Sequence, residues 1–285
     1  MDLSFLPDEA TPDFEAGLRL GAELGLRYAE VRLVDGVNVL DLTDDQIQRA
    51  RQLLDSYGMA VSAIATPFFK CAIPGREPQL AGPLHGAKEL SYDDHLDLLA
   101  RGIEIAQAFD APSMRIFSFW KEEGVDFWPA VEEAVAVTLE SADGSGVMPC
   151  LENEGACCIG TSADMAEAAQ RLTNTNLKFI WDPGNSSYCG MPPRAEDFAH
   201  FANRIALVHL KDVAYNHDSG EPQSKLIGEG DTDFHAELQR LAAAGYDGRL
   251  TLEPHHCPGG DCVAGMRASV EAIRGIAAEV NRPFS

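Results

Sequence analysis

The sequence lacks any apolar run close to the roughly 20 residues that a membrane-spanning helix needs. Its first residues are acidic and carry no basic segment, so we expect no secretory signal peptide. Basic residues are also scarce, since 22 Lys and Arg stand against 45 Asp and Glu, for a net charge of −23. That charge repels a phosphate backbone. We therefore expect a cytoplasmic protein with neither a membrane nor a nucleic acid as its partner.

Two further absences concern cysteine pairs and a glycine motif. The seven cysteines are odd in number in a chain of 285 residues, so we expect reduced thiols and no disulfide framework. No Cys-x-x-Cys pair offers a thiolate zinc site. The first predicted strand is followed by Leu6-Pro-Asp-Glu9 and not by a glycine-rich fingerprint, which argues against a doubly wound dinucleotide-binding sheet.

The chain does contain a regular alternation of short apolar runs and amphipathic stretches. The apolar runs predict eight strands at residues 3–6, 28–33, 61–65, 113–117, 146–152, 177–182, 205–209 and 249–253. The amphipathic stretches predict helices at residues 11–24, 43–57, 93–109, 127–142, 162–172, 195–201, 234–243 and 263–280. Eight strand–helix units predict an α/β fold, a (β/α)8 TIM barrel that forms a single domain over residues 1–285.

Four successive predicted strands end in side chains that commonly bind metals. These are Glu152, Asp182, His209 and Glu253. Each alone could be a helix cap. A parallel barrel, however, brings the C-terminal ends of its strands to one face, and carboxylates buried together need a cation. Three carboxylates and one imidazole suit one divalent ion, for which we expect Mn²⁺, with Mg²⁺, Co²⁺ and Zn²⁺ as alternatives.

Other polar and aromatic residues near the predicted barrel mouth are candidates for binding a substrate. Asn185 follows Asp182 in a predicted turn, and Arg115 lies inside a strand, where it needs a buried partner or a ligand. Lys211 shares a strand face with His209, although a solvated loop lysine is equally compatible with the sequence. The full set of candidate substrate contacts is Lys70, Arg115, Trp120, Asn185, Lys211 and His255.

Several residues have two open interpretations at this point. Arg32 could bind a substrate or pair with Glu30, two residues earlier on the same strand face. The aromatic residues Phe68 and Phe69, with Trp120, could form a wall for a sugar ring or pack in the core. The long connection over residues 66–91 is predicted to be a lid or side loop. His95 and His235 are expected on helix surfaces.

The order of these motifs resembles the xylose isomerase-like TIM barrel superfamily, the sugar phosphate isomerase/epimerase family. The segments that carry the resemblance are Leu151-Glu-Asn153, Trp181-Asp-Pro-Gly184, Val208-His-Leu-Lys-Asp212 and residues 227–234 and 244–253. The resemblance implies one divalent metal on the four strand-end residues, with Glu152 and Glu253 also acting as the acid/base pair. It further implies a small carbohydrate substrate and a homo-oligomer, a dimer or tetramer.

The predicted reaction is an isomerisation or epimerisation of a keto-sugar or cyclic polyol. The metal polarises a carbonyl, one carboxylate removes the neighbouring proton, and the other can return it from the opposite face. Two departures from the epimerases matter: Asn185 stands where they carry a histidine, and residues 213–224 lack their arginine. The alternative is therefore a lyase of the same scaffold, similar to inosose or dehydroshikimate dehydratases or to enzymes that cleave keto-glycosides or C-glycosides by elimination.

Two other classes of protein fit the sequence less well. A non-catalytic sugar-binding barrel would not need both Glu152 and Glu253. The endonuclease IV branch of the same fold needs more histidine ligands, whereas the third and fourth predicted strands end in Thr66 and Phe117. The net charge also opposes a nuclease.

Overall fold

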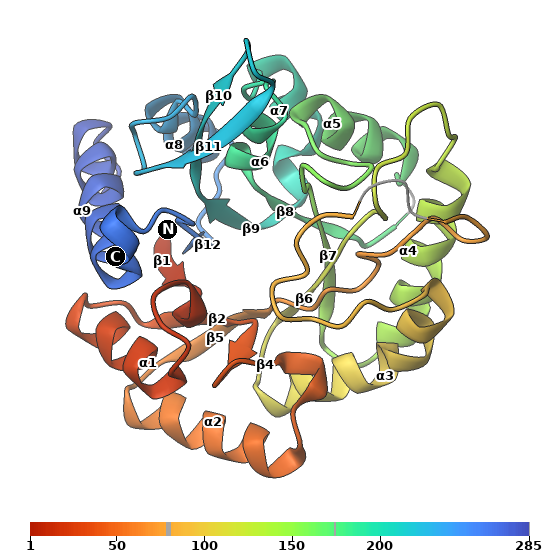
Figure 1. The fold of residues 1–285 in the computed structure, drawn as a ribbon, viewed down its shortest axis with the longest axis horizontal. Coiled ribbons are helices and arrows are strands. Elements are labelled where there is room, and N and C mark those ends of the chain that lie inside the picture. The colour runs from red at the N-terminus through yellow and green to blue at the C-terminus, as the bar shows by residue number, and fades with distance from the viewer. Residues whose placement is uncertain (78–80, 174, 285) are drawn as a thin grey trace.

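The structure, a computed structural model, describes residues 1–77, 81–173 and 175–284. Its centre is a closed barrel of eight parallel strands in the order β1-β12-β9-β8-β7-β6-β5-β2 (Figure 1). The barrel strands are β1 (Asp2–Phe5), β2 (Tyr28–Val31), β5 (Ala60–Ile64), β6 (Ser113–Ile116), β7 (Met148–Glu152), β8 (Lys178–Trp181), β9 (Ile205–Leu210) and β12 (Arg249–Leu252). The predicted TIM barrel is confirmed.

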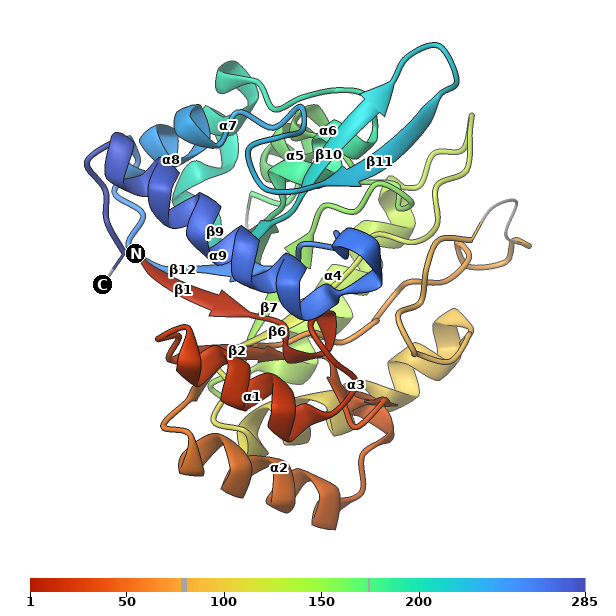
Figure 2. The ribbon, with the colours of Figure 1, turned by 60° about the vertical axis from the view of Figure 1, so that its left-hand side comes forward.

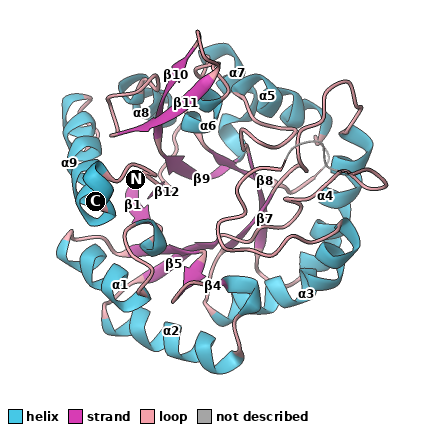
Figure 3. Cartoon of the chain, viewed as in Figure 1, coloured by secondary structure: helices cyan, strands magenta, loops and turns pink. Residues whose placement is uncertain are grey.

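Helices surround the barrel on its outside (Figure 3). They are α1 (Phe14–Glu23), α2 (Asp44–Ser56), α3 (Tyr92–Ala108), α4 (Trp128–Ala142), α5 (Ser162–Arg171), α6 (Pro183–Tyr188), α7 (Ala195–Phe201), α8 (Phe234–Ala243) and α9 (Cys262–Glu279). Three of them begin at capping boxes, in which Thr43, Ser91 and Thr161 are the N-caps. A capping box satisfies two backbone N–H groups that have no partner inside the helix. None of the described helices is long and apolar enough to cross a bilayer.

Two predicted boundaries are wrong. Helix α1 begins after Asp13 and not at Thr11, because the Asp13 carboxylate accepts a 2.8 Å hydrogen bond from the backbone of Ala16. The turn predicted after Asp182 is the first turn of α6, and Asp182 is its N-cap. Pro183 at the first helical position has the backbone angle that a helix start requires.

Two hairpins beside the barrel were not predicted. The first joins β3 (Leu33–Val34) to β4 (Val37–Asn38), and the second joins β10 (Asp212–Asn216) to β11 (Glu221–Lys225). Figure 2 shows the β10–β11 hairpin extending beyond the strand ends of the barrel. The Asp212 carboxylate accepts backbone hydrogen bonds from Gly228, Gly230 and Thr232, so it fixes the loop that follows this hairpin.

Two expectations about single side chains are also wrong. Cys257 and Cys262 form a disulfide, because the short loop between β12 and α9 brings their Cα atoms within 4.1 Å. His95 is 1% exposed on α3, where it packs against the rings of Phe68 and Phe69. Both phenylalanines are fully buried, so they are core residues and form no wall for a sugar ring.

Candidate metal centre

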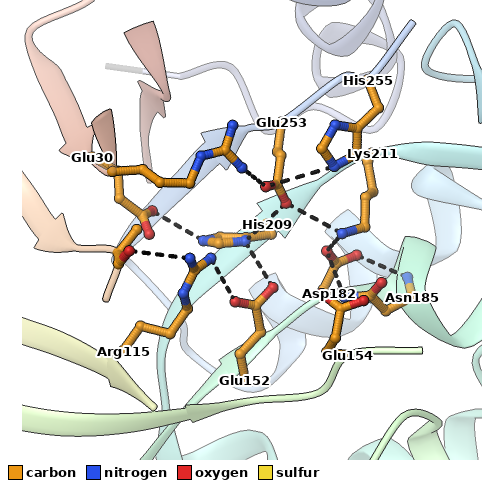
Figure 4. A network of polar contacts seen from close by, with 12 residues as sticks. Glu30, Arg115, Glu152, Glu154, Asp182, Asn185, His209, Lys211, Glu253 and His255 are labelled. Carbon is orange, nitrogen blue, oxygen red and sulfur yellow. Dashed lines mark hydrogen bonds and ion pairs between the residues drawn. The ribbon is translucent and has the colours of Figure 1, made fainter. Parts of the chain in front are cut away.

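The four predicted ligands meet at the C-terminal end of the barrel strands (Figure 4). Glu152 ends β7, Asp182 directly follows β8, His209 is the penultimate residue of β9, and Glu253 directly follows β12. Each is at most 3% exposed. Each offers a ligand atom, and these atoms all lie within 4.8 Å of one another. The parallel register of the barrel therefore gathers residues that are 101 positions apart in sequence, from 152 to 253.

His209 lies among three carboxylates. Its Nε2 is 3.0 Å from Glu30 Oε2, while its Nδ1 is 3.1 Å from Glu152 Oε1 and 3.5 Å from Glu253 Oε2. Burial alone would lower the pKa of His209. The nearby Glu30 and Glu152 carboxylates outweigh burial and raise that pKa well above its usual value. The surroundings of this imidazole thus favour positive charge.

An arginine holds each of the two glutamates. Arg115 of β6 lies 2.9 Å from Glu152 Oε2, and Arg32, which follows β2, lies 2.8 Å from Glu253 Oε1. Burial would raise the pKa of Glu152, but His209 and Arg115 lower that pKa to about 2. Burial would likewise raise the pKa of Glu253, and mainly Lys211 holds it well below the usual value. Arg115 thus has the buried partner that the sequence required.

Lys211 and Asn185 both contact Asp182. Lys211 Nζ is 2.9 Å from Asp182 Oδ2 and 3.2 Å from Glu253 Oε2, and the lysine side chain is only 7% exposed. The solvated-lysine interpretation is therefore wrong. Asn185 donates its side-chain N–H to Asp182 Oδ2 at 3.2 Å and to the Asn153 carbonyl at 2.7 Å. Burial raises the pKa of Asp182 to about 6, although Lys211 opposes this shift.

The remaining candidates are His255, Lys70 and Trp120, each of which is buried or half-buried. His255 Nδ1 is 3.0 Å from Glu9 Oε2, and its Nε2 is 3.6 Å from Glu253 Oε1. The His255 ring stacks on His85 of the 66–91 connection, with the ring centroids 5.4 Å apart. Lys70, from the same connection, pairs with Glu154 at 3.2 Å. Its ammonium lies 6.0 Å from the ring centre of Trp120, which is 3% exposed.

The charge of this region suits a divalent cation. Its side chains include seven carboxylates, each at most 12% exposed, and four cations, each at most 7% exposed. The carboxylates are Asp8, Glu9, Glu30, Glu152, Glu154, Asp182 and Glu253, and the cations are Arg32, Lys70, Arg115 and Lys211. Seven against four leaves three excess negative charges, and His209 and His255, whose pKa values are both raised, offset part of this excess when they are protonated. The remaining excess of carboxylates is costly to bury without a cation. Oxygen donors with one imidazole are ligands that Mn²⁺ and related ions accept.

Sequence reasoning missed part of this network. Glu30 and Arg32 do not pair with each other, because Glu30 reaches His209 while Arg32 reaches Asp8, Glu9 and Glu253. A usable signal was present, since two charged residues at period two in a buried strand both face the barrel interior. Asp8 and Glu9 lie in the short turn of residues 7–9 that follows β1, beyond Leu6 and Pro7, so they do not close an apolar run as the four ligands do.

A closed (β/α)8 barrel with buried carboxylate and histidine side chains at its C-terminal strand ends defines a TIM barrel with a site fit for a metal. The comparison with known families agrees with this class. Residues 18–276 match the family described as Xylose isomerase-like TIM barrel, and the chain belongs to this family.

The individual relatives and structures that resemble the chain share 15–30% of its residues over the aligned parts. The rhizopine catabolism protein MocC of Rhizobium meliloti is 30% identical over 35% of this chain and 35% of its own, so the match spans about a third of that relative. The IolI protein, solved with a bound zinc atom, is 15% identical with a TM-score of 0.75 over 98% of this chain and 99% of its own. The 3-keto-D-glucoside 4-epimerase YcjR of E. coli is 15% identical with a TM-score of 0.68 over 97% and 98%. The two structures share the fold of this chain.

Proposed function

We propose that this chain is a divalent-metal-dependent isomerase or epimerase that acts on an uncharged keto-sugar or cyclic polyol. The observation that carries the proposal is the buried quartet of Glu152, Asp182, His209 and Glu253, with ligand atoms within 4.8 Å of one another. The similar E. coli structure belongs to an epimerase of a keto-glucoside, which supports a keto-sugar substrate. The proposed reaction begins with removal of a proton next to a carbonyl.

The quartet would hold the cation, which when bound polarises a carbonyl and makes the neighbouring C–H more acidic. Glu152 and Glu253 come from β7 and β12, and β8 and β9 lie between these strands in the barrel. The two carboxylates therefore approach the site from different directions. One can take a proton from one face of the substrate, and the other can return a proton to the opposite face.

An uncharged substrate follows from how the basic side chains are paired. In the described part of the chain, Lys70 already pairs with Glu154, and Lys211 pairs with Asp182 and Glu253. Arg32 and Arg115 pair with carboxylates as well. A phosphate or carboxylate on the substrate would thus have to compete with protein carboxylates for these four cations. A keto-sugar or cyclic polyol without ionised groups needs no such cation.

One observation favours a lyase or dehydratase as the second candidate. Asn185 occupies the position at which the epimerases of this group are expected to carry a histidine. Its amide cannot exchange a proton as an imidazole does. It is also held by Asp182 and by the Asn153 carbonyl. An elimination begins with the same proton abstraction and needs no return of that proton to carbon.

Reaction in heavy water separates the two candidates. The metal-loaded protein is incubated in D₂O with D-fructose, D-tagatose, a 3-keto-glucoside and an inosose, and the products are examined by NMR and mass spectrometry. A recovered isomer with one deuterium at carbon supports an isomerase or epimerase. A product lighter by one water, or loss of the aglycone, with enone absorbance supports a lyase. Absence of both exchange and product with every compound would count against the proposal.

A further inference from the structure

Glu30 contacts the candidate metal centre from a strand that supplies none of its ligands. It is fully buried in β2, and its Oε2 lies 3.0 Å from His209 Nε2 in β9. These strands are not neighbours, because β1 and β12 stand between them in the barrel. The contact therefore crosses the barrel interior, and it joins residues 179 positions apart. Figure 4 shows the Glu30 carboxylate meeting one edge of the imidazole, while Glu152 lies at another.

This contact determines which nitrogen of His209 faces the site. An ionised carboxylate only accepts hydrogen bonds, so Nε2 carries the hydrogen and donates it to Glu30. In the neutral imidazole the free lone pair is then on Nδ1. Nδ1 lies 3.1 Å from Glu152 Oε1 and 3.5 Å from Glu253 Oε2, so it faces the other ligands. This buried atom has no hydrogen-bond partner among the described residues.

We propose that Glu30 is a positioning residue for the metal centre. It fixes the tautomer and the ring orientation of His209, so that Nδ1 is the ligand atom. The inference rests on the proposed metal-dependent function and adds a residue outside the ligand quartet. A carboxylate that accepts the other ring N–H of a ligating histidine also makes that histidine more basic. Loss of such a partner typically lowers metal affinity by about 10–100-fold.

A purely structural role explains Glu30 less well. Its second oxygen, Oε1, is buried without a hydrogen-bond partner in the described part of the chain. A buried carboxylate oxygen without a partner is costly for folding, so the Glu30–His209 contact alone does not explain a carboxylate at this position. Because Glu30→Gln removes one partner of a buried pair, it is expected to lower the stability of the metal-free protein under either role. The positioning role predicts that Glu30→Gln weakens metal binding as well. A structural role predicts lost stability with unchanged metal binding.

The test measures metal binding and metal-free stability separately. Mn²⁺ dissociation constants are determined by competition with a fluorescent chelator for the wild type, Glu30→Gln, Glu30→Met and the control Glu237→Gln. Glu237 is a buried carboxylate of α8 that contacts Trp181 and Arg240 and none of the four ligands. We expect about tenfold weaker binding in Glu30→Gln, up to about 100-fold in Glu30→Met, and no change in the control.

A spectroscopic measurement adds a readout that a structural role would not move. In the Zn²⁺-loaded wild type, ¹⁵N NMR should show His209 with a protonated Nε2 and a metal-bound Nδ1, and Glu30→Met should lose this pattern. Coordination through Nε2 in the wild type, or wild-type Mn²⁺ affinity in both Glu30 variants, would overturn the inference. A wild type that binds neither Mn²⁺ nor Zn²⁺ would overturn the proposed function itself.

Discussion

Each glutamate of the proposed acid/base pair divides its two oxygens between an arginine and the site. Glu152 directs Oε2 to Arg115 and Oε1 to His209, and Glu253 directs Oε1 to Arg32 and Oε2 to His209 and Lys211. The arginine fixes the orientation of the carboxylate, while the second oxygen stays directed at the site. The pKa of Glu152 is lowered by His209 and Arg115, and that of Glu253 mainly by Lys211. This arrangement suits a group that must accept a proton from a defined direction.

The first prediction concerns these two carboxylates. Glu152→Gln and Glu253→Gln should each lower kcat by at least about 100-fold, since a positioned general acid or base typically contributes 10²–10⁴-fold. The measurement is turnover at saturating Mn²⁺ with a substrate found in the heavy-water screen. Glu237→Gln is the matched control and should keep wild-type turnover. Activity close to wild type in either site variant would rule out its proton-transfer role.

Single residues also show what the sequence could and could not reveal. Glu152, Asp182, His209 and Glu253 were visible together because each closes an apolar run and the barrel brings strand ends to one face. The partner of Glu30 could not be found in this way, because His209 is 179 positions away and strand order does not say which side chains meet across the interior. Lys211 was ambiguous, since its burial depends on Asp182 and Glu253 from two other strands.

At the scale of single elements, the sequence predicted those helix starts that depend on hydrogen bonds between neighbouring residues. The capping boxes at Thr43, Ser91 and Thr161 start helices within a few residues of the predicted positions. The β3–β4 and β10–β11 hairpins were missed because their strands are short or mostly polar and half-exposed, so they lack the apolar pattern of a buried strand. Their pairing depends on the turn between the strands.

Helix α3 yields a prediction about pH. Burial lowers the pKa of His95 from 6.5 to about 4, partly offset by Asp94. Between these values the unfolded chain binds the proton first, so stability from this source is complete above pH 6.5 and is lost as the pH falls towards 4. Over this pH range the free energy of unfolding falls by at most about 3 kcal/mol through the protonation of His95. His95→Phe keeps an aromatic ring against Phe68 and should reduce the dependence of the free energy of unfolding on pH. Urea unfolding of both proteins between pH 7 and 4 measures this dependence. The same pH dependence in the variant and the wild type would contradict the assignment to His95.

The loop between β12 and α9 yields a prediction about cysteine. Closing a loop of this length with the Cys257–Cys262 disulfide should stabilise the fold by about 2 kcal/mol. The double variant Cys257→Ser, Cys262→Ser should lose this amount in urea unfolding. Thiol titration of the denatured, unreduced wild type provides an independent check. Five reactive thiols are expected with the disulfide, whereas all seven would show that it is absent.

For the whole molecule, the candidate ligands connect strands that make up half of the barrel. They come from β7, β8, β9 and β12, while the arginines that hold the glutamates come from β6 and from the residue after β2. A cation bound by the quartet would therefore stabilise the closed barrel as a unit. A ligand that binds only the folded state raises the free energy of unfolding by about 2.7 kcal/mol when its free concentration is 100 times its dissociation constant.

Chelation should remove both this stability and the activity. Exhaustive EDTA treatment is expected to lower Tm by about 5 °C or more, and Mn²⁺ or Co²⁺ should restore Tm and turnover. Differential scanning calorimetry with and without metal measures the shift. Asp182→Asn should lose most of the metal-induced shift, while Glu237→Gln should keep it. A wild-type Tm and turnover that are both indifferent to prolonged chelation would contradict a metal-dependent function.

The position of β12 also has a consequence for synthesis on the ribosome. This last strand closes the barrel against β1 and ends next to Glu253. Arg32 is made early, yet its partner Glu253 follows 221 residues later. A nascent chain without β12 therefore lacks both barrel closure and the fourth candidate ligand. The full set of candidate ligands exists only after β12 and Glu253 have emerged, so a cation would bind the proposed site only in chains that already include them.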